Sequence, residues 1–281
     1  MRIAYLGPAG TFTEDALRAA GGAAGEAVLT TTVSEAIEAV RDGRADRALI
    51  PFENSIEGSV RPALDTLARL VGEVTIVGEH DHPVRINLIA RSEIGLEDIR
   101  EVISHAQPLA QCAEFLRTEL SGASTRAVES TAEAVRLVSE SGEAVAALGA
   151  LSAAELYGCT VLRESVEDEG ENVTRFVWVA PAGSKAEGEG PWKTSLVFAE
   201  LGEDHPGALV SALHEFSSRG VNLIRIESRP RRNELGRYMF FIDAEGSLSD
   251  ADVAAAVEGL RSQAESVDIL GSYPVAANPV E

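Results

Sequence analysis

The chain has 281 residues, of which 45% are hydrophobic and 25% charged, so it can bury real cores and fold as about two domains. Its formal net charge of −21 argues against a nucleic-acid-binding protein, because phosphate contacts need clustered lysine and arginine. No apolar run is long enough to span a membrane, and the start lacks the features of a signal peptide, which predicts a cytoplasmic protein. The two cysteines, Cys112 and Cys159, show no metal-ligand spacing, and no disulfide is expected.

Strand-like and helix-like patterns alternate along the first part of the chain. The first block has a strand at 2–6, a helix behind the capping pair Thr11 and Glu14, a helix from Ser34 to Gly43, a strand at 48–51, a helix at 60–70 and strands at 74–77 and 84–90. The second has a strand at 102–104, a helix at 109–120, a helix behind the capping pair Ser130 and Glu133, a strand at 144–148, a helix that ends at Tyr157 and a strand at 175–180. Such units predict mostly parallel sheets in two lobes with a cleft between them, and we expect the strand at 174–180 to return to the first lobe.

The segment 181–191 is rich in glycine, proline and charge and predicts a linker. After it come strands at 195–201, 221–229, 238–242 and 267–270, with helices from Pro206 to Gly220 and from Ser249. The order βαββαβ is typical of a ferredoxin-like domain. Within the second of these strands, Ile224 and Ile226 are expected on one face and Arg225 and Glu227 on the other.

Four polar loops lie between a strand and a helix or at a helix start, where a ligand can bind in an α/β fold. They are 7–13, 51–60, 104–112 and 130–133. In the first, glycines and a helix N-terminus suit an anion, although a plain connecting turn is equally compatible. Asn54 and Ser55 in the second either bind a ligand or cap the helix, and His105 in the third either donates a proton or satisfies a helix end. The last is nearly explained by its capping box alone.

The fifth candidate is Asn172-Val173-Thr174-Arg175-Phe176, at the edge of a buried strand. An arginine and a hydroxyl there can bind a carboxylate and hydrogen-bond a leaving oxygen, whereas the alternative is a turn that enters a strand. No nucleophile elbow, Walker loop or nicotinamide fingerprint is present. The pattern therefore indicates a neutral polar site with one arginine, suited to an anionic organic acid.

These segments, taken in order, resemble the prephenate dehydratase family with an attached ACT regulatory domain, over essentially the whole chain. The motifs are 7–12, 51–55 with Gly58, 130–132 and 172–176 in the first domain, and 207–210 and 227–230 in the second. One departure concerns Ser104-His105-Ala106-Gln107-Pro108-Leu109, where the family usually reads Ser-His-Pro-Gln-Ala-Leu. A proline is still tolerated in the first helical turn.

The resemblance implies an α/β fold with a two-lobed, periplasmic-binding-protein-like (type II) catalytic domain and a ferredoxin-like βαββαβ ACT domain. The catalytic domain would span 1–182, with lobe 1 at about 1–78 and 174–182 and lobe 2 at about 79–173. A linker at 183–192, the ACT domain at 193–272 and a tail at 273–281 would follow.

The implied reaction converts prephenate to phenylpyruvate, water and carbon dioxide, with no cofactor and no metal. By similarity Thr174 supplies the essential hydroxyl, Arg175 pairs with a substrate carboxylate, and Phe176 completes the catalytic motif. The implied substrate-binding residues are Ala9, Gly10, Thr11, Glu53, Asn54, Ser55, Ser104, His105, Gln107, Thr131 and Asn172.

The resemblance also implies feedback control by L-phenylalanine at the ACT domain. Its binding residues would be Gly207, Ala208, Leu209, Val210, Asn222, Leu223, Glu227 and Ser228, at an interface of a homodimer or homotetramer formed through this domain. The alternative is a purely structural dimerisation module. Two rival functions are an arogenate dehydratase and a non-catalytic amino-acid sensor with the same two lobes.

Overall fold

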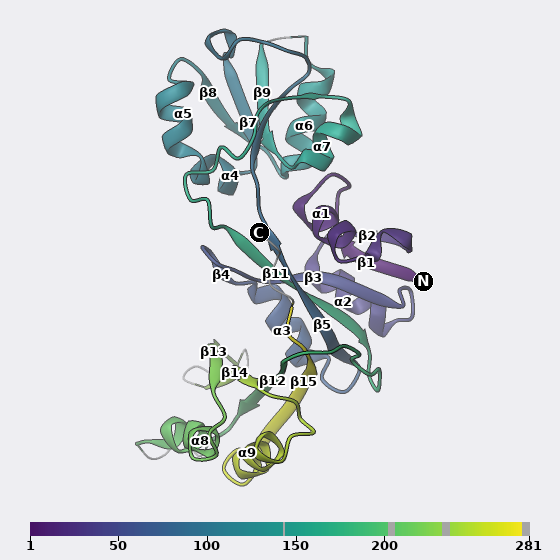
Figure 1. Ribbon diagram of the computed structural model, residues 1–281, viewed down its shortest axis with the longest axis vertical. Helices are drawn as coiled ribbons and strands as arrows, with labels where there is room; N and C mark the ends of the chain where they lie inside the picture. The colour runs from purple at the N-terminus through teal and green to yellow at the C-terminus, as the bar shows by residue number, and fades with distance from the viewer. Residues whose placement is uncertain (143, 202–205, 232–236, 277–281) are drawn as a thin grey trace.

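The computed structural model describes residues 1–142, 144–201, 206–231 and 237–276. Three bodies follow one another along the long axis of the molecule (Figure 1). Lobe 2 lies at one end, lobe 1 in the middle and the C-terminal domain at the other end. The predicted class, a two-lobed α/β domain followed by a ferredoxin-like domain, is confirmed. Among the described residues, no helix is long and apolar enough to cross a membrane.

Lobe 1 is built on a mixed sheet. Its elements are β1 (Arg2–Leu6), α1 (Phe12–Ala19), β2 (Glu26–Thr30), α2 (Val33–Arg41), β3 (Arg47–Asn54), β4 (Gly58–Ser59), α3 (Arg61–Arg69), β5 (Val74–Pro83) and β11 (Val173–Pro181). Parallel pairing joins β1 to β2 and β3, whereas β11 is antiparallel to both β3 and β5. The strand at 174–180 therefore returns to this sheet, and the chain passes between the lobes twice.

Lobe 2 has a separate sheet with the strand order β10-β6-β9-β7-β8. Its elements are β6 (Asn87–Ala90), β7 (Glu101–Ser104), α4 (Ala106–Gln111), α5 (Ala113–Glu119), β8 (Ser124–Ala127), α6 (Thr131–Glu140), β9 (Val145–Gly149), α7 (Leu151–Tyr157) and β10 (Thr160–Arg163). The neighbouring strands β8, β7 and β9 are parallel, with β8 at one edge, and β6 and β10 add antiparallel pairs at the other side. Both sheets are thus mixed rather than mostly parallel.

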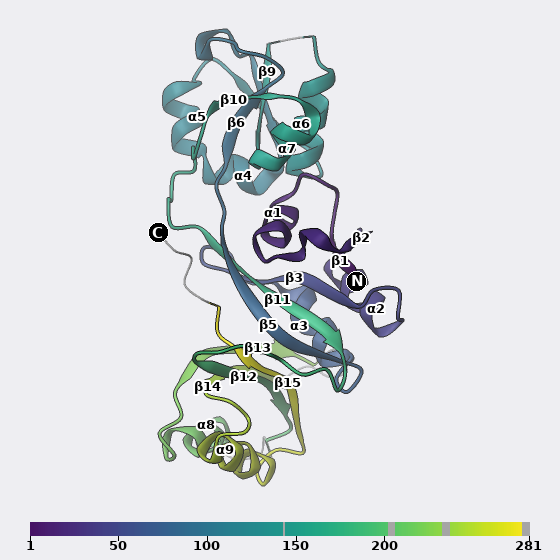
Figure 2. The same cartoon turned by 45° about the vertical axis from the view of Figure 1, so that its right-hand side comes forward.

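The C-terminal domain has the predicted order βαββαβ. It comprises β12 (Trp192–Ala199), α8 (Ala208–Ser217), β13 (Leu223–Pro230), β14 (Tyr238–Glu245), α9 (Ala251–Arg261) and β15 (Ser266–Pro274). Both helices cover the face of the sheet that points away from lobe 1 (Figure 2). The end of the predicted tail, from residue 277, lies outside the described residues. Tyr273 within that tail is fully buried in β15.

The sheets of lobe 1 and the C-terminal domain are continuous. Strand β15 pairs in parallel with β5, so the order runs β13-β14-β12-β15-β5-β11-β3-β1-β2. One hydrophobic cluster joins Phe52 and Leu64 of lobe 1 to Val197, Phe241 and Tyr273 of the C-terminal domain. The helix-free face of the C-terminal sheet therefore packs on lobe 1, and this contact fixes the position of the C-terminal domain relative to lobe 1.

Several predicted element ends differ from the structure. Thr11 makes no side-chain cap to α1, and Glu14 instead accepts a hydrogen bond from the Gly10 N–H at 2.6 Å. The Ser130 cap is confirmed by its 3.1 Å hydrogen bond from the Glu133 N–H. Thr32 rather than Ser34 caps α2, Asp250 rather than Ser249 precedes α9, and the helix at 109–120 is divided into α4 and α5 at Cys112.

Candidate active site

A cleft of about 810 Å³ lies between the two lobes, where α1 faces α4 and α6 (Figure 1). All five predicted polar segments reach it. Its lining comprises Leu6, Gly7, Pro8, Thr11, Phe12, Thr13, Leu29, Thr30, Thr31, Pro51, Asn54, Val84, His105, Gln107, Pro108, Gln111, Glu129, Ser130, Thr131, Glu133, Asn172, Thr174 and Phe176.

Thr174 lies in the wall of this cleft, on β11. Side chains of a strand alternate between its faces, and both Thr174 and Phe176 line the cleft. Thr174 is only 8% exposed, and its hydroxyl oxygen accepts a 2.9 Å hydrogen bond from Asn54 Nδ2. The same register pairs Thr174 with Asn54 across the two strands.

The orientation of the Asn54 amide is fixed by its own partners. Its Oδ1 accepts 3.0 Å hydrogen bonds from the N–H groups of Ile56 and Glu57, so its Nδ2 must point the other way. That NH₂ donates to Thr174 Oγ1 and, at 2.6 Å, to Asn172 Oδ1. Because an amide NH₂ can only donate, Thr174 is an acceptor in this contact, and its own proton is left free to donate to another group.

Gln111 is a cleft residue that the sequence analysis did not assign. It ends α4 in lobe 2, and its Oε1 accepts a 3.4 Å hydrogen bond from Asn172 Nδ2. Its Nε2 is buried and has no hydrogen-bond partner among the described residues. Such a donor, left free at a cleft, is a contact point for a ligand acceptor. The signal was its position four residues after Gln107, on the same side of a helix.

Electrostatics in the cleft come from helix ends rather than from an arginine. The lining residues include neither arginine nor lysine, and those with ionisable side chains are His105, Glu129 and Glu133. Thr11 and Ser130 are the N-cap residues of α1 and α6, and the first turns of both helices line the cleft. The N–H groups of these first turns lack helical partners and carry partial positive charge, so they suit a carboxylate.

Arg175 does not lie in the cleft, which corrects the expectation that it meets a substrate carboxylate there. It follows Thr174 on β11 and therefore points to the opposite face of the sheet. Its Nη1 lies 3.0 Å from Glu53 Oε2, and three further carboxylates surround it at 3.6–3.8 Å. Burial alone would lower the pKa of this guanidinium, but the carboxylates, Glu79 first, raise it above its usual value.

Five other predicted residues lie near the cleft without lining it. Glu53 forms an ion pair with Arg175 on the face of the sheet opposite the cleft. The Ser55 hydroxyl oxygen accepts a 3.0 Å hydrogen bond from the Val173 N–H at the start of β11. Ser104 is fully buried and donates to the Leu148 carbonyl at 2.7 Å. Ala9 and Gly10 belong to the β1–α1 loop, where a Cβ on Gly10 would lie 3.1 Å from the Ala153 backbone of lobe 2. These five residues support the strands and the loop that carry the lining residues.

His105 satisfies a helix end, one of its two predicted roles, and also lines the cleft. Its Nδ1 accepts a hydrogen bond from the Gln107 N–H at 3.4 Å, which caps α4, while the ring lines the cleft. Pro108 is the third residue of α4, where a missing N–H breaks no helical bond. The altered order of this motif therefore leaves both His105 and Gln107 at the cleft.

Six of the eight expected effector residues lie at the start of α8 or at the start of β13. Gly207 precedes α8 with a φ of 96°, a backbone conformation that favours glycine, and Val210 is 71% exposed. Asn222 accepts a hydrogen bond at its carbonyl from the Glu245 N–H. Glu227 and Ser228 are consecutive residues further along β13, so their side chains point to opposite faces of the sheet.

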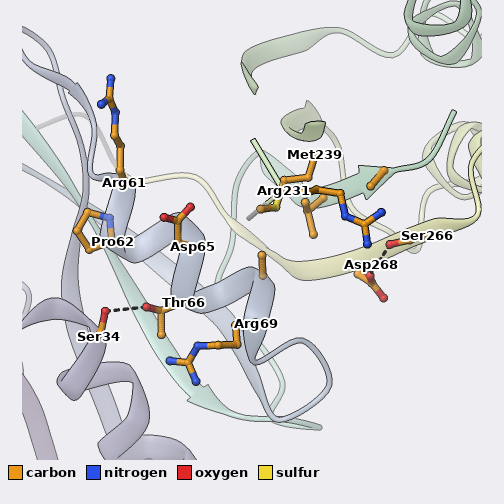
Figure 3. Close-up of a pocket in the computed structure, with 13 residues that line it drawn as sticks. Ser34, Arg61, Pro62, Asp65, Thr66, Arg69, Arg231, Met239, Ser266 and Asp268 are labelled. Atoms are coloured by element: carbon orange, nitrogen blue, oxygen red, sulfur yellow. Dashed lines mark hydrogen bonds between the residues drawn. The ribbon is translucent and has the colours of Figure 1, made fainter. Parts of the chain in front are cut away.

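A second cavity, of about 480 Å³, lies between α3 and the C-terminal sheet (Figure 3). Its polar lining includes Arg61, Asp65, Arg69, Arg231 and Asp268. None of the predicted site residues is among those that line it. It marks the seam between lobe 1 and the C-terminal domain.

A neutral polar cleft between two α/β lobes, joined to a small βαββαβ domain, defines an enzyme for a small organic acid with an appended regulatory-type domain. Comparison of the chain with known families gives the class a name. The prephenate dehydratase family matches residues 3–184, and the ACT domain family matches residues 196–262. The chain belongs to the prephenate dehydratase family.

Individual relatives agree with this assignment. The prephenate dehydratase of Amycolatopsis methanolica is 41% identical, over 97% of this chain and 88% of its own length. The structure of prephenate dehydratase from Arthrobacter aurescens in complex with L-Phe is 40% identical with a TM-score of 0.89, and the match covers 98% of this chain and 90% of that one. A structure described as GqqA, a novel type of quorum quenching acylase, is 31% identical with a TM-score of 0.86, over 99% of both chains.

Proposed function

We propose that this enzyme converts prephenate to phenylpyruvate, water and carbon dioxide in L-phenylalanine biosynthesis. The observation that carries the proposal is the Thr174 hydroxyl, which lines the interlobe cleft and accepts from Asn54, so that its own proton is free to donate to a ligand there. Family membership over nearly the whole chain supports the same reaction.

In this reaction two bonds that join the substrate ring to its substituents break, and the ring stays intact. The bond to the ring carboxylate breaks and releases carbon dioxide, and its electron pair enters the ring as hydroxide leaves from the opposite carbon. Aromatisation drives both steps, so the enzyme need only help the hydroxide depart. Thr174 donates a hydrogen bond to that oxygen as negative charge develops on it. A threonine hydroxyl is too weak an acid to protonate it, so water or another group completes the water molecule.

The two substrate carboxylates need donors that the cleft supplies without an arginine. The N–H groups at the starts of α1 and α6 lie on opposite lobes and suit one carboxylate each. Gln111 Nε2 adds a free donor on the lobe 2 side. A substrate held by both lobes closes them around itself and excludes water from the reacting atoms.

Substitution of Thr174 tests the proposal directly. Phenylpyruvate released from prephenate is followed by its ultraviolet absorbance. We expect Thr174→Ala to lower kcat about 100-fold while KM changes by less than about threefold, because the contact forms with the transition state. Thr174→Ser keeps the hydroxyl and should retain most of the activity. An alanine variant with wild-type turnover would remove Thr174 from the mechanism.

The same assay distinguishes prephenate from arogenate, which carries an amine in place of the keto group. Turnover of both substrates side by side, with product formation normalised to enzyme, decides which is preferred. A protein that binds either compound without forming product would support the sensor instead of an enzyme.

We also propose that L-phenylalanine regulates the enzyme at the ACT domain and that two subunits pair there. Strand β13 is the outermost strand of the described sheet, with unpaired backbone groups along its free edge. Ile224, Ile226 and Val210 are 43%, 49% and 71% exposed, an apolar surface close to the predicted effector residues. Calorimetry with L-phenylalanine on the full-length protein tests this role, and absence of binding would favour a structural module.

A further inference from the structure

A network of charges lies behind the active site, on the far face of the strands that carry Thr174 and Asn54; Arg225 and Asp243 are buried in it, whereas Arg175, Glu53 and Asp81 are about a quarter to a third exposed. Arg175 Nη1 is 3.0 Å from Glu53 Oε2, and its Nε is 3.6 Å from Asp81 Oδ1. Asp243 Oδ2 approaches Arg175 Nη1 at 3.8 Å and Arg225 Nη1 at 3.9 Å. These side chains are called the rear ion network below.

The rear ion network joins two domains. Glu53, Asp81 and Arg175 come from β3, β5 and β11 of lobe 1, whereas Arg225 and Asp243 come from β13 and β14 of the ACT domain. Arg225 reaches furthest: its Nη2 donates to Ser59 Oγ at 2.8 Å, its Nε lies 3.6 Å from Glu53 Oε1, and its guanidinium lies over the Phe52 ring at 4.9 Å. An ACT-domain arginine therefore contacts the residue that neighbours Asn54.

Register makes the network relevant to catalysis. The antiparallel pairing of β11 with β3 places Thr174 opposite Asn54 and Arg175 opposite Glu53. The first pair forms the hydrogen bond in the cleft, and the second forms the ion pair behind it. A register irregularity follows directly, between Arg175 and Phe176. A slip of one residue would turn Thr174 out of the cleft. The Arg175–Glu53 ion pair therefore helps to hold the register that places Thr174 opposite Asn54.

Several polar atoms of the rear ion network have no hydrogen-bond partner among the described residues. Buried atoms without a hydrogen bond in the described part of the chain include Arg175 Nε, Arg225 Nε, Arg225 Nη1 and Asp243 Oδ2. Their nearest opposite charges lie at 3.6–3.9 Å, beyond good hydrogen-bond length. A small shift of the ACT domain would shorten some of these contacts and lengthen others. Interactions of this kind in a low-dielectric interior are strong enough to favour one arrangement over another.

We propose that Arg175 is a positioning residue rather than a substrate ligand, and that the rear ion network transmits the state of the ACT domain to Thr174. The inference rests on the proposed function and specifies its regulation. Binding of an effector shifts β13, Arg225 changes its contacts with Glu53 and Asp243, and the Arg175–Glu53 pair moves the Thr174–Asn54 pair.

The first experiment separates positioning from substrate binding. Arg175→Met removes the charge and Arg175→Lys keeps it. We expect Arg175→Met to lower kcat about tenfold or more with KM within about threefold, and Arg175→Lys to restore most of kcat. Glu53→Gln, a milder change in the same pair, should lower kcat in the same way if Arg175→Met does not fold. A KM raised about 100-fold at near-normal kcat would make Arg175 a substrate ligand and overturn the proposal.

The second experiment measures the response to the effector, as the ratio of activity without and with saturating L-phenylalanine. Arg225→Met should bring this ratio close to one while the calorimetric affinity for L-phenylalanine stays within about threefold of wild type. Asp65→Asn is the matched control, because Asp65 on α3 also holds an ACT arginine, Arg229, at 2.9 and 3.1 Å but lies outside the rear ion network. It should keep the full response.

The outcomes distinguish this inference from the proposed function. A wild-type protein that forms no phenylpyruvate refutes the function itself. With an active, responsive wild type, an unchanged response in Arg225→Met refutes the network alone. Equal loss of response in Arg225→Met and Asp65→Asn also refutes it, because any loosening of the seam between the domains would then suffice.

Discussion

Asn54 controls the direction of the hydrogen bonds at Thr174. Two backbone N–H groups hold its carbonyl oxygen, so its NH₂ faces the threonine and makes that hydroxyl an acceptor. The threonine proton is thereby available for the leaving oxygen. Asn54 thus orients Thr174 in addition to lining the cleft.

Asn54→Asp reverses this direction with almost no change in shape. The new carboxylate still accepts from Ile56 and Glu57, but it also accepts the Thr174 proton, which is then unavailable to substrate. We expect kcat to fall about 100-fold with the fold retained. If Asn54 acts through Thr174, adding Asn54→Asp to Thr174→Ala should lower kcat little further, and fully additive losses in steady-state kinetics would contradict the argument.

His82 makes stability depend on pH beside the active site. It lies opposite Thr174 on β5, and burial, then the neighbouring His80, lowers its pKa from 6.5 to about 4. The unfolded chain therefore takes up a proton at a pH where the folded protein does not. Stability from this group is present above pH 6.5 and is lost as pH falls from 6.5 to about 4.

His82→Gln should flatten that dependence. The pKa shift corresponds to about 2 kcal/mol after allowance for partial exposure of the ring. Urea unfolding at pH 7 and at pH 4.5 gives the loss of stability for each protein, and His82→Gln should lose about 2 kcal/mol less than wild type. Acidic groups titrate in both proteins and cancel in the difference. Equal losses would show that His82 is protonated in the folded state.

Most of the residues that line the cleft could be predicted from the sequence, but the positively charged Arg175 was expected in the cleft and lies on the opposite face of the sheet. Thr174, Asn54, Asn172 and Thr11 were recognisable because short polar side chains at strand and helix ends mark a binding edge. Arg175 was grouped with Thr174 because the two adjoin in one motif. Period-2 alternation sends neighbours on a strand to opposite faces, and the partners of Arg175 come from strands far along the chain, which no local pattern reveals.

At the scale of elements, the junction of β15 with β5 holds the ACT domain to lobe 1. Gly271 pairs with Ile76 there, and a Cβ on Gly271 would lie 2.2 Å from the Ile76 carbonyl oxygen. Only a residue without a side chain permits this backbone approach. The junction matters for function because β5 also pairs with β11, the strand of Thr174.

Gly271→Ala should therefore separate the two sheets at this point. We expect a loss of about 3 kcal/mol in the free energy of unfolding, because backbone rather than a movable side chain opposes the new methyl group. Gly122→Ala is the control, since its Cβ would meet nothing within 4 Å. Urea denaturation of the two variants provides the comparison, and equal stabilities would mean that the junction opens without cost.

Elements were predictable where they are buried and missed where they are not. Strands such as β1, β9 and β12 are mostly buried and carry runs of apolar residues, and they were found. By contrast, β8 is exposed along its whole length and β2 nearly so, because each lies at an edge of its sheet. An exposed edge strand needs no apolar pattern, since backbone pairing with one neighbour holds it in place.

At the scale of the molecule, the ACT domain and the cleft lie on opposite faces of one sheet. The interlobe cleft opens on the Thr174 face of β11, and the ACT domain is attached through the Arg175 face. An effector can therefore act on catalysis without entering the cleft. Lobe 2 is tied to this sheet by the two passages of the chain after β5 and before β11, which leaves it able to close over substrate.

If two subunits pair through β13, as proposed, a substitution that breaks this pairing should also abolish the regulation by L-phenylalanine. Ile226 is 49% exposed on that strand and precedes Glu227, one of the proposed effector residues. Strand β13 and lobe 2 lie towards opposite ends of the molecule (Figure 1). A charge there opposes burial against a second copy. We expect Ile226→Asp to shift the protein towards monomers in sedimentation velocity, to keep kcat without effector within about threefold, and to abolish the phenylalanine response. Leu151→Asp, at an equally exposed leucine of lobe 2, should change neither property. A monomeric Ile226→Asp protein that still responds to phenylalanine would place the effector site within one subunit.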